Sequence, residues 1–448
     1  MNTRFWRGGL NTLLIALLMS CGGGGSSSGI GSSSSGSVSA SVAASTDGAT
    51  LTAAVVSGGT DSGSTGSSAA SGSTTTASNG NGSGVGSGGT GISVAGDATS
   101  VGAVDGIGSI IVNGLRYDID NAAIDLRDAA ALQIGMSVEV MGSVDASFTN
   151  GVATQVTSAA DLRGPVTAID PIGGSFVVMG TTVTIDEATV WADVSGLASL
   201  IPGTTIQVWG LPASPGVLRA TRVQQQIPSA APIATGTVQQ LDLARGTFAL
   251  GGLTVAYGSA SFAGGIDPTT LTNGTIVRVR ADTQASPGLL TATQVESWYP
   301  IPGATGTPIQ LEGVITNYAA LNSFQVLGRS IDASAAQITG GQASKIGNGV
   351  KIQVGGTLVN GVLVATEIKI KHIPGAGALP SFTLIGSIGN YVSAASFRVH
   401  GQLVNASAPD VAFVNGTQAN LANGVKVTVV GAEVVNGILL ASQVSFGP

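Results

Sequence analysis

Residues 424–429 read Gly-Val-Lys-Val-Thr-Val, so apolar and polar side chains alternate along this stretch. The same pattern, Gly-x-x-Val/Ile-x-Val, occurs at residues 135–140, 203–208, 274–279, 349–354 and 424–429. An alternation with a period of two is typical of a β-strand that buries one face. The five copies therefore predict an all-β chain built from repeats.

Three other short patterns accompany this one in a constant order. Each copy opens on a Val or Ile, usually after a Gly-rich lead, continues with Ser/Thr-Phe-x-aliphatic (Ser-Ile-x-aliphatic in the first copy), and ends with Ala-Thr/Ser-x-Val/Ile. Successive opening residues are 65 to 76 positions apart, at Val101, Val166, Val238, Val314 and Ile388. This periodicity indicates tandem repeats. We assign them to residues 98–162 (repeat 1), 163–227 (repeat 2), 233–299 (repeat 3), 309–373 (repeat 4) and 381–448 (repeat 5).

Turn signals divide each repeat into short strands. The pairs Asn113-Gly114, Asn360-Gly361 and Asn436-Gly437 predict type I′ hairpins, because both turn positions of that type need a positive φ. A unit of about 70 residues with five or six strands predicts a small OB-like β-barrel. We expect a tandem array of about five such barrels, joined by Pro-containing linkers into a bent rod, with at most a helical turn between strands.

The amino terminus has the features of an export signal. Arg4 and Arg7 precede a short apolar core at residues 10–19, which is too short to span a bilayer. The following residues, Leu18-Met19-Ser20-Cys21, resemble the bacterial lipobox, which implies cleavage after residue 20 and acylation of Cys21, palmitate included. The alternative is a conventional signal peptide with an incidental cysteine.

Two further observations bear on the anchor. Cys21 is the only cysteine, so it has no disulfide partner within the chain, which favours lipidation. Gly22 stands where an Asp would signal inner-membrane retention, and by analogy with known lipoproteins we expect the outer membrane. Residues 21–97 are nearly all Gly, Ser, Thr and Ala, so we predict a disordered linker between anchor and repeats.

The order of the four patterns resembles a repeated domain of unknown function found in bacterial envelope lipoproteins. The resemblance covers residues 101–446. It implies an all-β fold and a place in the cell envelope, and it brings no activity and no site residues.

Composition excludes several classes of protein. Only 9% of the 448 residues are charged, against about 25% in a typical soluble domain. The 17 basic and 24 acidic residues give a net charge of −7, which disfavours a nucleic-acid partner. Two histidines and one cysteine exclude a zinc finger, a disulfide scaffold and a Cys/His catalytic pair.

Three polar clusters are candidate sites. Asp118 and Asp120 share a strand face, with Asp125 and Asp128 beyond, and two carboxylates could meet Ca²⁺. The calcium-loop Gly and Glu are missing, so we interpret the cluster as a solvated strand face. His372 and His400 lack partners in motif spacing, and we predict no metal site. The basic group Lys369, Lys371 and His372 is too small for a nucleic-acid patch.

A phenylalanine recurs once in most repeats, at Phe176, Phe248, Phe324 and Phe397, with Ile110 in the first. Aromatic residues on OB-type sheets can stack on bases or sugars. The exchange for Ile favours a role in the core, which is our prediction. Trp191, Trp209 and Trp298 follow no register, and both surface contacts and core packing stay open for them.

These observations lead to a functional hypothesis. We expect a lipid-anchored, non-enzymatic envelope protein without cofactor or catalytic residues, whose repeats serve as a spacer or interaction surface. Its expected partners are the membrane, through the anchor, and an envelope protein or glycan whose identity the sequence does not give. The alternative is a carbohydrate-binding array that gains affinity through avidity. An enzyme is a third class, for which no nucleophile or acid–base set recurs.

Overall fold

The computed structural model describes residues 94–145, 147–283, 286–376 and 380–447. These residues form β-strands and three short 3-10 turns, η1 (Leu197–Ser199), η2 (Ala343–Lys345) and η3 (Gln418–Asn420), and include no α-helix. The predicted all-β class is confirmed. The signal peptide, Cys21 and almost all of the linker lie outside the described residues, and β1 begins at Val94.

The first two repeats each contain six strands. Those of repeat 1 are β1 (Val94–Ile107), β2 (Ile110–Val112), β3 (Leu115–Asp118), β4 (Ala123–Leu126), β5 (Ser137–Asp145) and β6 (Asn150–Ser158). Those of repeat 2 are β7 (Leu162–Asp170), β8 (Ser175–Val178), β9 (Thr181–Thr184), β10 (Val190–Trp191), β11 (Thr205–Pro212) and β12 (Val217–Gln225).

Repeat 3 has the same order of strands, but its first and last strands are each interrupted. They are β13 (Ile233–Thr237) and β14 (Gln239–Asp242), then β15 (Thr247–Leu250), β16 (Leu253–Ala256), β17 (Ser261–Ala263), β18 (Ile276–Arg280), β19 (Leu289–Thr291) and β20 (Gln294–Ser297). Repeat 4 contains β21 (Pro308–Ala320), β22 (Ser323–Val326), β23 (Arg329–Asp332), β24 (Gln337–Thr339), β25 (Lys351–Val359) and β26 (Val362–His372). Repeat 5 contains β27 (Phe382–Ser393), β28 (Ser396–Val399), β29 (Gln402–Asn405), β30 (Ala412–Val414), β31 (Lys426–Val435) and β32 (Ile438–Phe446).

The strands of repeats 1, 2, 4 and 5 each pair in a closed ring, whereas the strands of repeat 3 are divided between two sheets. In repeat 1 the order is β1–β2–β3–β6–β5 and back to β1, with the β3–β6 pair parallel and the other pairs antiparallel. β4 also pairs with β6, beyond the residues that pair with β3. Repeat 5 repeats this order as β27–β28–β29–β32–β31, closing on β27. Its fold is therefore that of repeat 1.

The predicted Asn-Gly hairpins are confirmed. Asn113 and Gly114 have φ values of 56° and 73°, Asn360 and Gly361 have 51° and 84°, and Asn436 and Gly437 have 50° and 71°. Asn and Gly are the residues that adopt this left-handed region at least cost, which is why the sequence marks these turns so clearly.

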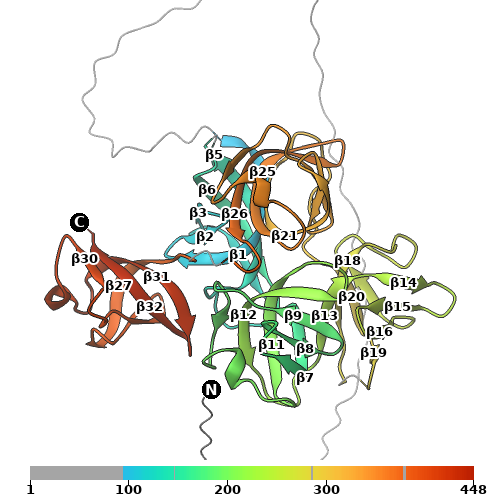
Figure 1. Cartoon of the computed structure of the whole chain (residues 1–448), viewed down its shortest axis with the longest axis horizontal. Helices are drawn as coiled ribbons and strands as arrows, with labels where there is room; N and C mark the ends of the chain where they lie inside the picture. Colours follow the sequence, from blue (N-terminus) through green and yellow to red (C-terminus); the bar gives the residue numbers. More distant parts are fainter. Residues whose placement is uncertain (1–93, 146, 284–285, 377–379, 448) are drawn as a thin grey trace, which may run out of the picture. The chain divides into compact units, whose positions relative to one another are not determined.

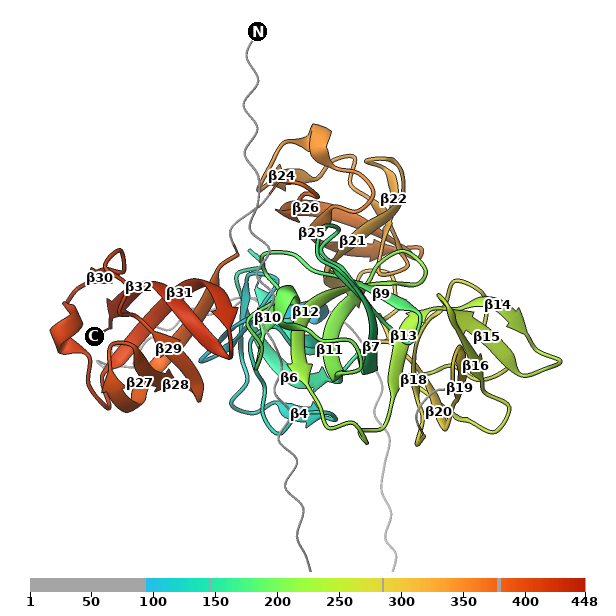
Figure 2. The ribbon, with the colours of Figure 1, turned by 60° about the horizontal axis from the view of Figure 1, so that its bottom comes forward.

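The repeats contact one another directly, and this differs from the expected rod of linked units. β1 pairs in parallel with β21 of repeat 4, at Thr99–Ile309 to Val101–Leu311, and with β27 of repeat 5, at Gly106–Thr383 (Figure 1). β7 of repeat 2 pairs with β13 of repeat 3 (Figure 2). Unpaired strand edges are costly to leave exposed, and here edges of one repeat are covered by another.

Hydrophobic packing also crosses between repeats. One core joins repeats 2 and 3, and Trp209 and Ile233 pack into the core of repeat 1. Trp298 and Tyr299, at the end of repeat 3, are buried in the core of repeat 4. In consequence β25 is buried on both faces over Lys351–Gly356, whereas β31 of repeat 5 keeps the alternation that the sequence predicts.

Candidate functional site

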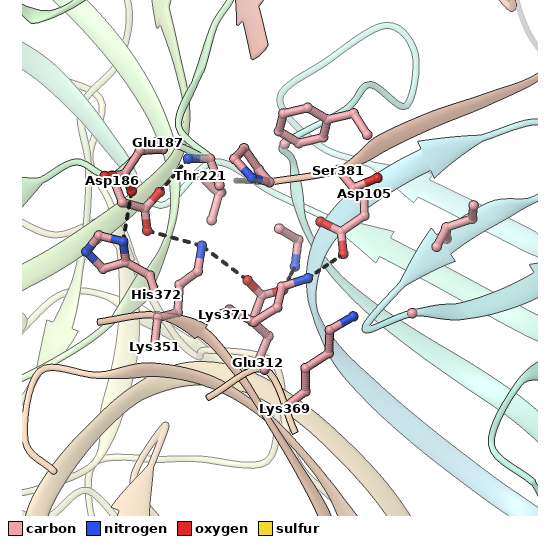
Figure 3. Close-up of a pocket in the computed structure, with 18 of the residues that line it drawn as sticks. Asp105, Asp186, Glu187, Thr221, Glu312, Lys351, Lys369, Lys371, His372 and Ser381 are labelled. Carbon is pink, nitrogen blue, oxygen red and sulfur yellow. Dashed lines mark hydrogen bonds and ion pairs between the residues drawn. The ribbon is translucent and has the colours of Figure 1, made fainter. Parts of the chain in front are cut away.

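A cavity of about 500 Å³ lies where repeats 1, 2 and 4 meet the start of repeat 5 (Figure 3). β1 contributes Asp105 and β21 contributes Glu312, while Lys351 comes from β25. Lys371 and His372 end strand β26. The remaining polar residues of interest are Asp186 and Glu187, which follow β9, and Thr221 on β12.

The charged side chains of this cavity form ion pairs between repeats. Lys351 Nζ lies 3.2 Å from Asp186 Oδ2 and 3.4 Å from Glu312 Oε1. Lys371 Nζ lies 3.0 Å from Asp105 Oδ2, and His372 Nδ1 lies 2.8 Å from Glu187 Oε2. Figure 3 shows Lys351 between Asp186 and Glu312, so one ammonium group connects repeats 2 and 4.

Burial makes these pairs interdependent. The side chains of Lys351, Asp186 and Glu312 are 4%, 1% and 1% exposed. Burial opposes ionisation of Asp186, but the charges of Lys351, Arg219 and His372 outweigh it and hold the pKa of Asp186 below its ordinary value. Burial likewise opposes the charge on Lys351, and Asp186 and Glu312 outweigh it, so the pKa of Lys351 is raised. Both groups are therefore charged at neutral pH.

A second charged junction connects repeats 1, 2 and 3 around Asp161. This carboxylate is fully buried and accepts hydrogen bonds from Ser137 Oγ at 2.7 Å and the Gly210 backbone N–H at 2.8 Å. It also accepts one from Arg278 Nη2 at 3.0 Å and one from Trp298 Nε1 at 2.6 Å. Four donors from three repeats thus converge on one side chain.

Arg278 extends this junction. Its Nε donates to the Ala160 carbonyl at 3.0 Å, its Nη1 lies 3.4 Å from Glu296 Oε1, and its guanidinium carbon lies 4.9 Å from the centroid of the Tyr299 ring. Burial opposes its charge, but Asp161 together with Glu296 outweighs it and raises the pKa of Arg278. Such a cation–π contact in a desolvated site adds to the ion pair.

Asp128 forms a third connection. Its carboxylate accepts from Arg163 Nη2 of repeat 2 at 2.6 Å and from Arg280 Nη2 of repeat 3 at 2.8 Å. Arg280 and Arg163 together outweigh the opposing effect of burial and hold the pKa of Asp128 below its ordinary value. The interpretation of Asp128 as part of a solvated face is wrong, because two arginines from other repeats cover it.

The other acidic residues of that cluster do not converge. Asp118 and Asp120 are exposed, and Asp118 Oδ1 accepts the Asp120 backbone N–H at 2.9 Å, which closes a turn. Asp125 lies 3.3 Å from Arg127. Among the described residues, no three His, Cys, Asp or Glu side chains are grouped as a metal site would need.

The two histidines lie in different environments. His372 Nδ1 lies 2.8 Å from Glu187 Oε2, and His400 lies in the β28–β29 turn, where its Nε2 is 2.9 Å from the Ile385 carbonyl oxygen. Of the predicted basic group, Lys371 pairs with Asp105 and Lys369 is exposed. The sequence singled out these basic residues but not their acidic partners, because the partners lie in other repeats.

The recurring phenylalanines are buried, as predicted. Phe176 and Phe248 are 1% exposed, Phe324 is 2% exposed and Phe397 is fully buried. The tryptophans are buried too, which decides between the two roles left open for them: Trp191, Trp209 and Trp298 are 7%, 1% and 4% exposed. Trp209 and Trp298 each fill the core of a repeat other than their own.

The fold and its junctions define a repeat protein of β-strand rings joined through buried charges. Four stretches, residues 99–157, 163–224, 235–296 and 312–369, match the family described as Domain of unknown function (DUF5666). They cover more than half of the chain, which therefore belongs to this family. The matched stretches fall in repeats 1 to 4, and repeat 5 shares their strand order. No curated protein matches the chain.

One further structural finding concerns the membrane. In residues 94–447, leaving aside the undescribed gaps, no helix is long and apolar enough to cross a bilayer.

Proposed function

We propose that this chain is an exported, lipid-anchored protein of the bacterial envelope whose repeats form a non-enzymatic scaffold with interaction surfaces. In this proposal residues 1–20 are a lipoprotein signal peptide, Cys21 carries the lipid, and residues 21–97 link the anchor in the outer membrane to the repeats. Each ring of strands is an OB-like barrel, since a first strand that pairs with the next-to-last one and a parallel closing pair are features of that fold.

The observation that carries the scaffold proposal is that ion pairs lie at the junctions between repeats. In a chain with few charged residues, ion pairs at the junctions connect different repeats: Arg163–Asp128, Arg278–Asp161, Arg280–Asp128, Arg127–Glu296, Lys351–Asp186 and Lys371–Asp105. Desolvating charges is costly unless the geometry is well fixed. Pairs of this kind favour one arrangement of the repeats, as a scaffold requires.

The same pairing supports a non-enzymatic role. Acid–base and nucleophilic catalysis need a group that is free to exchange protons with a substrate. In the cavity of Figure 3, Asp186 and Glu312 instead share Lys351, and Asp105 lies 3.0 Å from Lys371, although burial outweighs that pairing and raises the pKa of Asp105. The glycan-binding alternative loses its main argument, because the phenylalanines that suggested stacking are buried.

Replacement of the anchor residue tests the localisation. Cys21→Ser should abolish incorporation of labelled palmitate and release the protein from the membrane fraction, while Ser28→Ala, also in the linker, should change neither. Palmitate that still enters the Cys21→Ser variant would contradict the anchor. Reproducible binding on a glycan array would replace the scaffold with the carbohydrate-binding alternative.

A further inference from the structure

A second cavity, of about 480 Å³, lies where repeat 5 meets repeats 1 and 2. Arg222 of β12, Arg398 of β28 and His400 of the following turn contribute to its wall. The described residues that line it include no Asp or Glu. This separates it from the cavity of Figure 3, where Lys351 and Lys371 lie beside carboxylates.

Arg222 is a buried cation without a carboxylate partner. The residue is 5% exposed and donates from Nη1 to the Ile134 carbonyl at 3.0 Å and from Nη2 to Gln133 Oε1. Its Nε has no acceptor among the described residues. Because a guanidinium carries five N–H donors, two hydrogen bonds leave most of its capacity unused. An unpaired buried charge of this kind is expensive.

The acidic residue whose charge acts on Arg222 is Asp193, and it is occupied elsewhere. Both carboxylate oxygens of Asp193 lie 2.9 Å from the backbone N–H of Gln225, and Asp193 is exposed to solvent. Burial lowers the pKa of Arg222 to about 10, and the charge of Asp193 opposes this effect only in part. A bound anion would relieve the cost that burial imposes on the guanidinium.

Comparison among the repeats indicates that the ring fold does not require these cations. The position of Arg222 in the pattern Ala-Thr/Ser-x-Val/Ile is occupied by Gln155, Gln294 and Gln443 in repeats 1, 3 and 5. Arg398 follows the recurring Phe, where the other repeats have Ile111, Val177, Ala249 and Gln325. No other repeat has a cation at either position, since repeat 4 has Glu367 in place of Arg222, and both arginines line the same cavity.

We propose that this cavity is a binding site for a phosphate group, either free or carried by a sugar or lipid headgroup. Arg222 supplies a fixed, partly unsatisfied guanidinium, and planar arginine forks match tetrahedral oxyanions well. Arg398 is exposed, also lines the cavity and donates from Nη1 to the Gly401 carbonyl. The volume falls in the range of small-molecule sites, so a phosphosugar fits the available space.

The test is calorimetric titration of the whole mature chain with inorganic phosphate, with a hexose phosphate, and with phosphatidylcholine vesicles with and without phosphatidic acid. Arg222→Gln introduces the residue that repeats 1, 3 and 5 have at this position, and it should weaken binding by about tenfold or more. Arg398→Gln removes a more exposed cation and should weaken binding several-fold. Lys426→Gln, an exposed lysine of repeat 5, is the matched control and should leave affinity unchanged.

Each outcome decides the proposal. Binding of free phosphate that both arginine variants weaken supports it, and binding of the phosphatidic acid vesicles alone, weakened in the same way, identifies a lipid headgroup as the source. Absence of binding to every probe overturns it. Binding that Arg222→Gln and Arg398→Gln leave unchanged also overturns it. If Arg222→Gln lowers the melting temperature, Arg398→Gln still decides, since its side chain is not part of a core.

Discussion

Replacement of Asp161 by Asn provides a sharp test of the charged junctions. The variant keeps the size of the side chain but removes its charge and turns one acceptor into a donor. At 3.0 Å from Arg278 Nη2, the lost attraction is about 5 kcal/mol at an effective dielectric constant of about 20, and the burial that raises the pKa of Asp161 offsets part of it. Glu296, 3.4 Å from Arg278 Nη1, retains part of the compensation.

The expected loss of unfolding free energy is therefore about 3–5 kcal/mol, the usual cost of breaking a buried pair on one side. Denaturant titration of the wild type and the variant measures this loss, provided that the free energy of unfolding depends on denaturant concentration with the same slope in both. Asp242→Asn is the matched control, because Asp242 pairs with the exposed Arg245 within one turn, and it should leave the midpoint nearly unchanged. Arg278→Met added to Asp161→Asn should recover part of the loss, since no unpaired charge then stays buried. A loss below about 1 kcal/mol for Asp161→Asn would refute the reasoning.

Three other predictions concern single side chains. Phe324→Ala should cost about 3–5 kcal/mol by removing a buried ring of repeat 4, and a loss below about 1 kcal/mol by denaturant titration would show that Phe324 is not a core residue. Lys351→Met should cost about 3–5 kcal/mol because it leaves Asp186 and Glu312 buried without their shared cation, and an unchanged denaturation midpoint would count against that junction. Burial raises the pKa of Glu139 from 4.5 to about 7, and the charge of Arg278 opposes this shift only in part. Between these two pH values the folded state therefore binds more protons than the unfolded state. The free energy of unfolding should fall as the pH rises through this range, by about 3 kcal/mol at most. Glu139→Gln should flatten that slope in melting curves recorded from about pH 5 to about pH 8, and an equally steep decline in the variant would assign the slope to another group.

The strands and turns could be predicted from the sequence because their causes are local. The alternation along residues 424–429 and the positive φ values required at Asn436 and Gly437 are both properties of neighbouring residues. The burial of Phe324 followed from its exchange for Ile110 at the same place in repeat 1. These inferences did not depend on knowing how the repeats pack together.

The junctions could not be predicted, because the same local pattern has two outcomes. Val350-Lys351-Ile352 and Val425-Lys426-Val427 are alike in sequence, yet Lys351 is buried against Asp186 and Lys426 is exposed. The difference lies in which strand face another repeat covers, and Asp186 lies 165 positions before Lys351 in the chain. The sequence therefore singled out Lys371 and His372 as basic residues but not Asp105 and Glu187 as their partners.

The most direct test of the central claim, that buried charges hold the repeats in one arrangement, is scanning calorimetry of the mature chain with Cys21→Ser. We predict that repeats 1 to 4 melt in a single cooperative transition, and that combining Asp161→Asn with Lys351→Met splits it into separate transitions at lower temperature. The claim would be contradicted if the chain without these two junction substitutions already melted in separate transitions, and if adding both substitutions left those transitions unchanged.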